Sequence, residues 1–417
     1  GSCRLAASSY EEMMSWSDGN FRNFFLKYPE ANNLFRRMLY VSAKLKLQTP
    51  ENQEARNELY MGQCNCTYWH GVFGGVYLTF LRHAAYKHLL AAQALVERQG
   101  EFWVEAESLD FDGDGVEEII LKNPNFNLFI APQRGGGIFE IDYIPKRVNL
   151  TDVMTRRAES YHSKVGSAKK APLDLTKDLR LNIHDLLGCK ERGLEHLLFY
   201  DNYRRMSLLE HFWPRATLLQ EVKTAAYIEL GDFINEPYRP EIKRYSEGIA
   251  VILTREGKVR LHERAFPVRI TKQININDKD ARVNFGYRLE NLGSEPIEAL
   301  FAVEFNLAPE SQATANQLHL YDEFSDKLYA LNEDIEVKAV RNVLLHDAEN
   351  GIETSLHFEK QPKVWIYPLE TISASEAGFE RNYQHSVILA VWDLRLESSW
   401  QANVVFLASS KQTPIKT

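Results

Sequence analysis

Two short stretches of this 417-residue chain carry side chains that could do chemistry. The first is the run QCNCTYWHGVFGGVYLTFL at residues 63–81, where amide, aromatic, imidazole and glycine groups lie close together. Asn65, Trp69 and His70 are residue types with which proteins stack on a sugar ring and hydrogen-bond its hydroxyl groups. We therefore predict that these three residues bind a carbohydrate substrate. Because the run also has apolar residues at helical spacing, a buried core face is the alternative interpretation.

The second stretch is the acidic run DFDGDGVEE at residues 110–118. Its oxygen donors stand at alternate positions: the carboxylates of Asp110, Asp112, Asp114 and Glu118 and the carbonyl of Val116. This spacing, with a glycine at the sixth position, lets a loop surround a hard cation with oxygen ligands, which Ca²⁺ prefers. The loop is not an EF-hand, because its twelfth position is Leu121 and not a glutamate. We predict a structural Ca²⁺ site here, and a metal-free acidic turn is the alternative.

The elements that must position these stretches are of two kinds, because the apolar periodicity changes near Gly100. Before this residue, spacing of three and four predicts helices over residues 9–16, 19–47, 50–61 and 72–99. Pro29 is expected to divide the second of these helices, and Pro50 to lie in the first turn of the third after Thr49 as N-cap.

After Gly100, apolar residues alternate in many short runs, which predicts β-strands. Residues 283–289 and 299–307 are interpreted as a hairpin that turns at Gly293 and Ser294. Residues 161–201 are less regular, and short helices are expected at 173–187 and 193–198. The predicted fold class is therefore α+β, with a helical domain over residues 1–100 and a large antiparallel β-sandwich over residues 101–417.

Charge and composition narrow the classes of partner. A formal net charge of -8 leaves no basic surplus for nucleic acid, and no apolar run is long enough to span a membrane. The four cysteines are too few and too irregularly spaced for a disulfide framework or a four-thiolate zinc site. We expect a soluble, cytoplasmic protein that binds neither nucleic acid nor membrane and holds no organic cofactor.

Six segments, in order along the chain, resemble glycoside hydrolase family 57, the family of 4-α-glucanotransferases and α-amylases. They are SYEEMMSWS, NFFLKYPEANNLFRRMLYVS, QCNCTYWHGVFGGVYLTFLRHAAY, LDFDGDGVEEIILKN, PQRGGGIFEIDYIPKRVNLTDVMTRR and GLEHLLFYDNYRRMSLLEHF. The resemblance implies a helical domain followed by a β-sandwich similar to the galactose mutarotase-like super-sandwich. It also implies an α-1,4-glucan or maltooligosaccharide as the partner.

The catalytic glutamate and aspartate of that family lie on a (β/α) barrel N-terminal to the resembling segments, so we assign no catalytic residue in this chain. Retaining glycoside chemistry needs two carboxyl groups about 5 Å apart. The chain also departs from the family pattern, with Cys66, Thr79 and Phe21 in place of an aspartate, a proline and a tryptophan. A thiol at Cys66 cannot accept several sugar hydrogen bonds as a carboxylate can.

Two functions therefore remain open. The chain is either the C-terminal portion of an α-glucan-acting hydrolase or transglycosylase, with a barrel supplied elsewhere, for example by a separate chain. Alternatively, it is a non-catalytic relative that binds α-glucan or serves as an interaction module.

Overall fold

The computed structural model describes residues 21–48, 52–70, 74–97, 100, 102–165, 193–310, 316–321, 326–375 and 378–410. The chain divides into two compact units. The helical unit comprises Gly1–Val96, Met154–Asn202 and Glu370–Gln384, and the sandwich unit comprises Glu97–Val153, Tyr203–Leu369 and His385–Thr417.

This division places the first boundary close to the expected residue 100, but it groups two later segments with the helices. The reason is a small apolar cluster that sequence periodicity does not indicate. Tyr161 and Leu194 pack in this cluster with Ile372 and Phe379, which come from the outer parts of two long strands.

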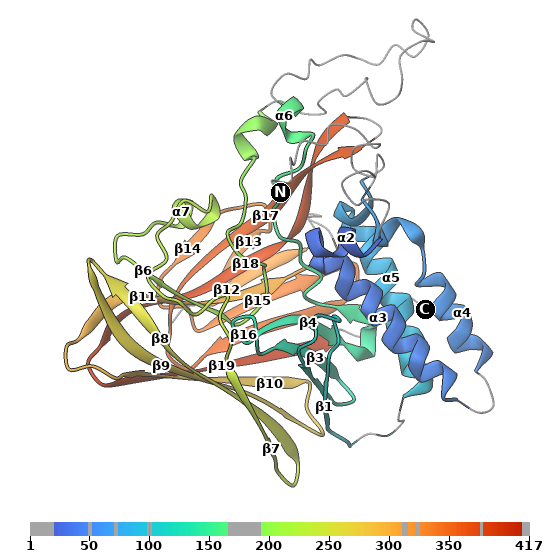
Figure 1. Cartoon of the computed structure of the whole chain (residues 1–417), viewed down its shortest axis with the longest axis horizontal. Helices are drawn as coiled ribbons and strands as arrows, with labels where there is room; N and C mark the ends of the chain where they lie inside the picture. The colour runs from blue at the N-terminus through green and yellow to red at the C-terminus, as the bar shows by residue number, and fades with distance from the viewer. Residues whose placement is uncertain are drawn as a thin grey trace, which may run out of the picture. The chain divides into compact units, whose positions relative to one another are not determined.

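The helical unit is built from short and long helices. Their bounds are α2 Phe21–Lys27, α3 Pro29–Lys46, α4 Gln53–Met61, η1 Asn65–Tyr68, η2 Gly75–Tyr77, α5 Thr79–Val96, α6 His162–Val165 and η5 Leu194–Leu197. Figure 1 shows α3, α4 and α5 in blue, and their buried faces share one core that includes Val41, Leu59 and Leu89. No helix in the described part of the chain is both long and apolar enough to cross a membrane.

The helix boundaries confirm one prediction and correct two. Pro29 begins α3, as expected, because a first-turn residue needs no N–H donor. The predicted N-cap at Thr49 is wrong, because α4 begins later and Asn52 caps it by accepting the Ala55 N–H at 3.0 Å. The last helix starts at Thr79 and not near residue 72. The predicted helices over 9–16 and 173–187 lie outside the described residues.

In its described residues, the sandwich unit contains three antiparallel sheets. The first is a meander of β1 Glu105–Leu109, β2 Glu118–Lys122, β3 Phe126–Ala131, β4 Gly137–Tyr143 and β5 Val148–Asn149. The second has the order β13-β12-β15-β16-β19-β10-β9-β8-β7, with β7 Arg239–Arg244, β8 Gly248–Leu261, β9 Arg264–Asn277, β10 Arg282–Asn291, β12 Gln317–Tyr321, β13 Asp326–Ala330, β15 Asn342–Asp347, β16 Ile352–Phe358 and β19 Ser399–Ser410. The third has the order β14-β17-β18-β11-β6, with β6 Leu209–Trp213, β11 Ile297–Leu307, β14 Ile335–Val337, β17 Lys363–Ser375 and β18 Gly378–Leu396. A short helix, α7 Leu219–Lys223, follows β6. The α+β class and the antiparallel sandwich are confirmed.

The predicted hairpin between residues 283–289 and 299–307 is wrong. β10 pairs with β9 and β19, whereas β11 pairs with β6 and β18 in a different sheet. The turn near Gly293 therefore carries the chain from one sheet to another. Asn291 holds this corner, because its Nδ2 donates to the Glu295 carbonyl at 2.6 Å and to the Leu396 carbonyl at 3.1 Å. Alternating apolar residues specify which face of a strand is buried, but not which strand lies beside it.

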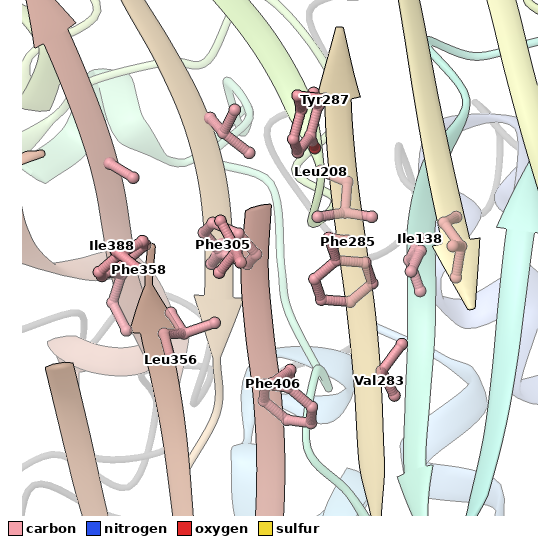
Figure 2. Packing of buried hydrophobic residues seen from close by; sticks show 14 of the residues in the cluster. Ile138, Leu208, Val283, Phe285, Tyr287, Phe305, Leu356, Phe358, Ile388 and Phe406 are labelled. Carbon is pink, nitrogen blue, oxygen red and sulfur yellow. The ribbon is translucent and has the colours of Figure 1, made fainter. Parts of the chain in front are cut away.

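A large apolar core extends through the sandwich unit, and a smaller one includes Trp213 and Trp365. Figure 2 shows Val283, Phe285 and Tyr287 at alternate positions along β10, with Phe406 of β19 in the same region. The rings of Phe285 and Phe305 have centroids 6.0 Å apart and join strands from two sheets. Complete burial of such a side chain contributes roughly 1.5–3 kcal/mol.

Candidate functional site

The acidic loop connects β1 to β2 and folds as a compact turn. Gly113 and Gly115 have positive φ values of 77° and 92°, which favour glycine. Their N–H groups donate to the Asp110 carboxylate at 2.8 and 3.1 Å. The carboxylates of Asp110, Asp112 and Glu118 thereby converge, with one oxygen of each within 4.8 Å of the others.

Asp112 and Glu118 are buried, and Glu118 is the less exposed of the two. It accepts the N–H of Phe111 at 2.9 Å, and burial, followed by the nearby Asp112 charge, raises its pKa to about 7. A carboxyl group with this pKa is stabilised as a carboxylate by any cation placed beside it. The donor set consists of oxygens only, so its chemistry suits Ca²⁺.

A residue that sequence reasoning missed reaches the loop from the turn between β3 and β4. Arg134 donates to Asp112 Oδ2 at 2.6 Å and also pairs with Asp114. Of the five predicted donors, the structure brings together the Asp110, Asp112 and Glu118 carboxylates, while Asp114 is engaged by Arg134. Val116 is exposed, and its N–H donates to Asp114 at 2.9 Å. The Ca²⁺ assignment stays a prediction.

The predicted sugar-binding residues occupy three different environments. Asn65 is exposed at the start of η1, and Trp69 is half-buried with its ring stacked on Phe24 at a centroid distance of 4.5 Å. His70 is 1% exposed and meets the rings of Tyr28 and Tyr77 edge-to-face. The burial of His70 agrees with the core interpretation for that residue, whereas Asn65 and part of Trp69 are accessible.

The His70 imidazole is held in place by its surroundings. Its Nδ1 lies 3.3 Å from the Gly74 carbonyl oxygen, and burial lowers the pKa of the ring. Burial of Trp69 and His70 does not measure sugar binding, so the role of Asn65, Trp69 and His70 stays a prediction.

Beside His70 lies Glu159, a carboxylate that the sequence analysis did not select. It accepts hydrogen bonds from Lys27 Nζ at 2.6 Å, from Tyr28 OH at 2.8 Å and from Tyr77 OH at 2.7 Å. Burial alone raises its pKa, but His70 and Lys27 outweigh burial and lower the pKa below the ordinary value. No local spacing indicates this residue, because its partners are 82 to 132 positions away along the chain.

A second buried network lies in the sandwich unit. His211 Nδ1 is 3.0 Å from Glu229, and its Nε2 is 3.4 Å from Glu304. Arg205 donates to Glu304 at 2.9 Å, and Tyr203 also donates to that carboxylate. All three of these side chains, Tyr203, Arg205 and His211, are buried.

This network has strongly shifted proton affinities. Burial lowers the pKa of His211, but hydrogen bonds to Glu229 and Glu304 outweigh burial and raise it to about 9. Burial raises the pKa of Glu304, but Arg205 and His211 outweigh it and lower the pKa to about 2. The raised pKa of His211 and the lowered pKa of Glu304 both favour an ion pair between this imidazole and this carboxylate.

Together, a helical unit, an antiparallel sandwich unit and an acidic loop at the start of the sandwich define a two-unit α+β protein. Residues 19–96 match the middle-domain model of the α-amylase/4-α-glucanotransferase family, and residues 110–406 match its C-terminal model. The chain therefore belongs to the α-amylase/4-α-glucanotransferase family, glycoside hydrolase family 57, as its six motif segments predicted.

Relatives and a solved structure agree with this assignment. The chain is 32% identical to α-amylase 1 of Dictyoglomus thermophilum, with 97% of this chain and 61% of the relative covered. It is 34% identical to the 4-α-glucanotransferase of Thermococcus litoralis, with 87% of this chain and 49% of the relative covered. The crystal structure of the Thermococcus litoralis 4-α-glucanotransferase superposes with a TM-score of 0.72 over 93% of this chain and 50% of that chain. The chain thus spans about half to three fifths of the length of these relatives.

Proposed function

We propose that this chain supplies the helical and sandwich portion of an α-glucan-acting enzyme of the α-amylase or 4-α-glucanotransferase type. The observation that carries the proposal is the order and extent of the two domain-model matches, residues 19–96 followed by 110–406. The catalytic carboxylates of such an enzyme would lie on a barrel N-terminal to these segments, and this chain would contribute one wall of the glucan site through Asn65 and Trp69.

Two reconstitution arms test this proposal. The purified chain alone, incubated with maltoheptaose, is expected to give no new oligosaccharides by product chromatography. Addition of a family barrel as a separate polypeptide is expected to raise product formation above that of the barrel alone. Turnover of roughly 1 per second or more by the chain alone would contradict the proposal, because that is an ordinary enzyme rate.

A second candidate function is a non-catalytic α-glucan-binding module. The observation that favours it is Cys66, an exposed free thiol where the family pattern has an aspartate. Cys66→Asp distinguishes the two functions. In an enzyme wall, the restored carboxylate is expected to increase turnover with the added barrel, whereas a binding module gains affinity for glucan without any gain in turnover.

We further propose that Asp110, Asp112 and Glu118, with Asp114 and Val116 at the rim, hold one structural Ca²⁺. Three close carboxylates destabilise the loop unless cations offset their charge, and Arg134 supplies one positive charge. The ion would fasten the β1–β2 connection and take no part in glycoside chemistry. Isothermal titration with calcium, compared between the parent and Arg134→Gln, tests the competition between guanidinium and metal.

A further inference from the structure

A single buried carboxylate joins separate segments of the helical unit. Glu159 is 6% exposed, and its three hydrogen-bond donors are Lys27 at the end of α2, Tyr28 at the N-cap of α3 and Tyr77 at the end of η2. One oxygen, Oε1, accepts both tyrosine hydroxyls, and the other, Oε2, accepts the lysine. The carboxylate therefore holds both tyrosine hydroxyl groups at one point.

Tyr77 is linked to Trp69 through a backbone hydrogen bond. The N–H of Val76, its neighbour in the chain, donates to the Trp69 carbonyl oxygen at 2.8 Å. Gly75 has a φ of 53°, and a Cβ at this position would lie 2.1 Å from the same oxygen. The backbone just before Tyr77 is therefore in direct contact with the backbone of Trp69.

Tyr28 is linked to Trp69 through the ring of Phe24, which contacts both. The ring of Tyr28 lies 4.5 Å from that of Phe24, and Phe24 stacks on Trp69 at the same centroid distance, with 27° between the planes. Such aromatic pairs contribute roughly 0.5–1.5 kcal/mol beyond their area burial and also fix ring orientation. Trp69 is thus linked to Glu159 in two ways, through its backbone carbonyl and Tyr77 and through its ring, Phe24 and Tyr28.

We infer that Glu159 is a positioning residue for the glucan-binding stretch, which holds Tyr28 and Tyr77 so that Trp69 is presented in one orientation. This inference rests on the proposed function, because it assigns a purpose to the orientation of Trp69. A carboxylate suits this task better than an amide, since it has acceptor capacity on both oxygens for all three donors. A glutamine would present an N–H₂ group to one of them and leave that donor without an acceptor.

The test uses the full chain labelled with 5-fluorotryptophan and observed by fluorine NMR. The resonance of Trp69 is identified by its loss in Trp69→Phe. In Glu159→Gln, we expect this resonance to shift or broaden without glucan, while resonances of tryptophans in the sandwich unit stay in place. The dissociation constant for maltoheptaose, read from the same resonance, is expected to rise about tenfold. Glu195→Gln is the matched control, because Glu195 belongs to the same unit and its side chain is 44% exposed.

The outcomes separate this inference from the proposed function. An unchanged Trp69 resonance in Glu159→Gln, with parental affinity for maltoheptaose, overturns the inference. If maltoheptaose does not change the Trp69 resonance of the parent, the proposed role of Trp69 in glucan binding is wrong. The Trp69 resonance measured without glucan still decides whether Glu159 positions Trp69. The single variants Tyr28→Phe and Tyr77→Phe each remove one hydroxyl and retain the ring, so they decide the same question if Glu159→Gln does not fold. Parental Trp69 resonances in both would overturn the inference.

Discussion

The buried imidazole of His211 leads to a prediction about stability and pH. Its pKa of about 9 is higher than the ordinary 6.5, because Glu229 and Glu304 outweigh the effect of burial. In the unfolded chain the imidazole loses these partners and returns to its ordinary pKa. The folded state therefore binds the proton more tightly, and this contribution to stability is complete below pH 6.5 and is lost as the pH rises through 9.

The size of the effect follows from the same two pKa values. Each tenfold difference in proton affinity is about 1.4 kcal/mol, so the proton on His211 contributes about 3 kcal/mol at pH 6. The low pKa of Glu304, about 2, reflects in part the same ion pair, so its contribution is not added. The free energy of unfolding of the sandwich unit is expected to fall by about this amount between pH 6 and pH 9.5.

Urea unfolding, monitored by tryptophan fluorescence at several pH values, measures how the free energy of unfolding changes with pH. His211→Gln is expected to have lower stability at pH 6 and a flatter profile up to pH 9.5. The exposed His196 is the control, and His196→Gln is expected to retain the parental slope. The imidazole itself can be followed by NMR of histidine labelled with carbon-13. A titration midpoint at or below pH 6.5, or parallel profiles for the parent and His211→Gln, would refute the reasoning.

Three further predictions concern Gly75, the acidic loop and Trp69. Gly75→Ala places a Cβ 2.1 Å from the Trp69 carbonyl oxygen, at a residue with a positive φ. We therefore expect calorimetry to give a melting temperature several degrees lower than that of the parent. A parental melting temperature would show that the backbone relaxes at this position. Chelation is expected to lower the melting temperature of the parent, with about 2.7 kcal/mol restored by calcium at a hundredfold excess over its dissociation constant. The melting temperature of Asp112→Ala is expected not to change with calcium. Glu117 is exposed, and Glu117→Ala is expected to respond to calcium like the parent. If the chelator leaves the melting temperature of the parent unchanged, the metal assignment is refuted. Maltoheptaose is expected to change the tryptophan fluorescence with a dissociation constant on the order of millimolar. Trp69→Ala is expected to abolish this change. An unaltered response in the variant would assign Trp69 to the core alone.

The sequence by itself determined the features that depend on neighbouring residues. Apolar spacing separated helices from strands near residue 100, and Pro29 marked the start of α3. The acidic loop was also visible, because its carboxylates and glycines lie within a few positions of one another. Local turns bring such groups together whatever the rest of the chain does.

Only the tertiary structure decided which distant groups meet. Glu159 lies 131 positions from Tyr28 and 82 from Tyr77, and Arg134 reaches Asp112 across 22 positions. The same limit explains the failed hairpin between β10 and β11, since the alternation in the sequence was correct but the partner strands belong to other sheets. Periodicity reports the environment of one element, whereas pairing between elements is selected by the packing of the whole core.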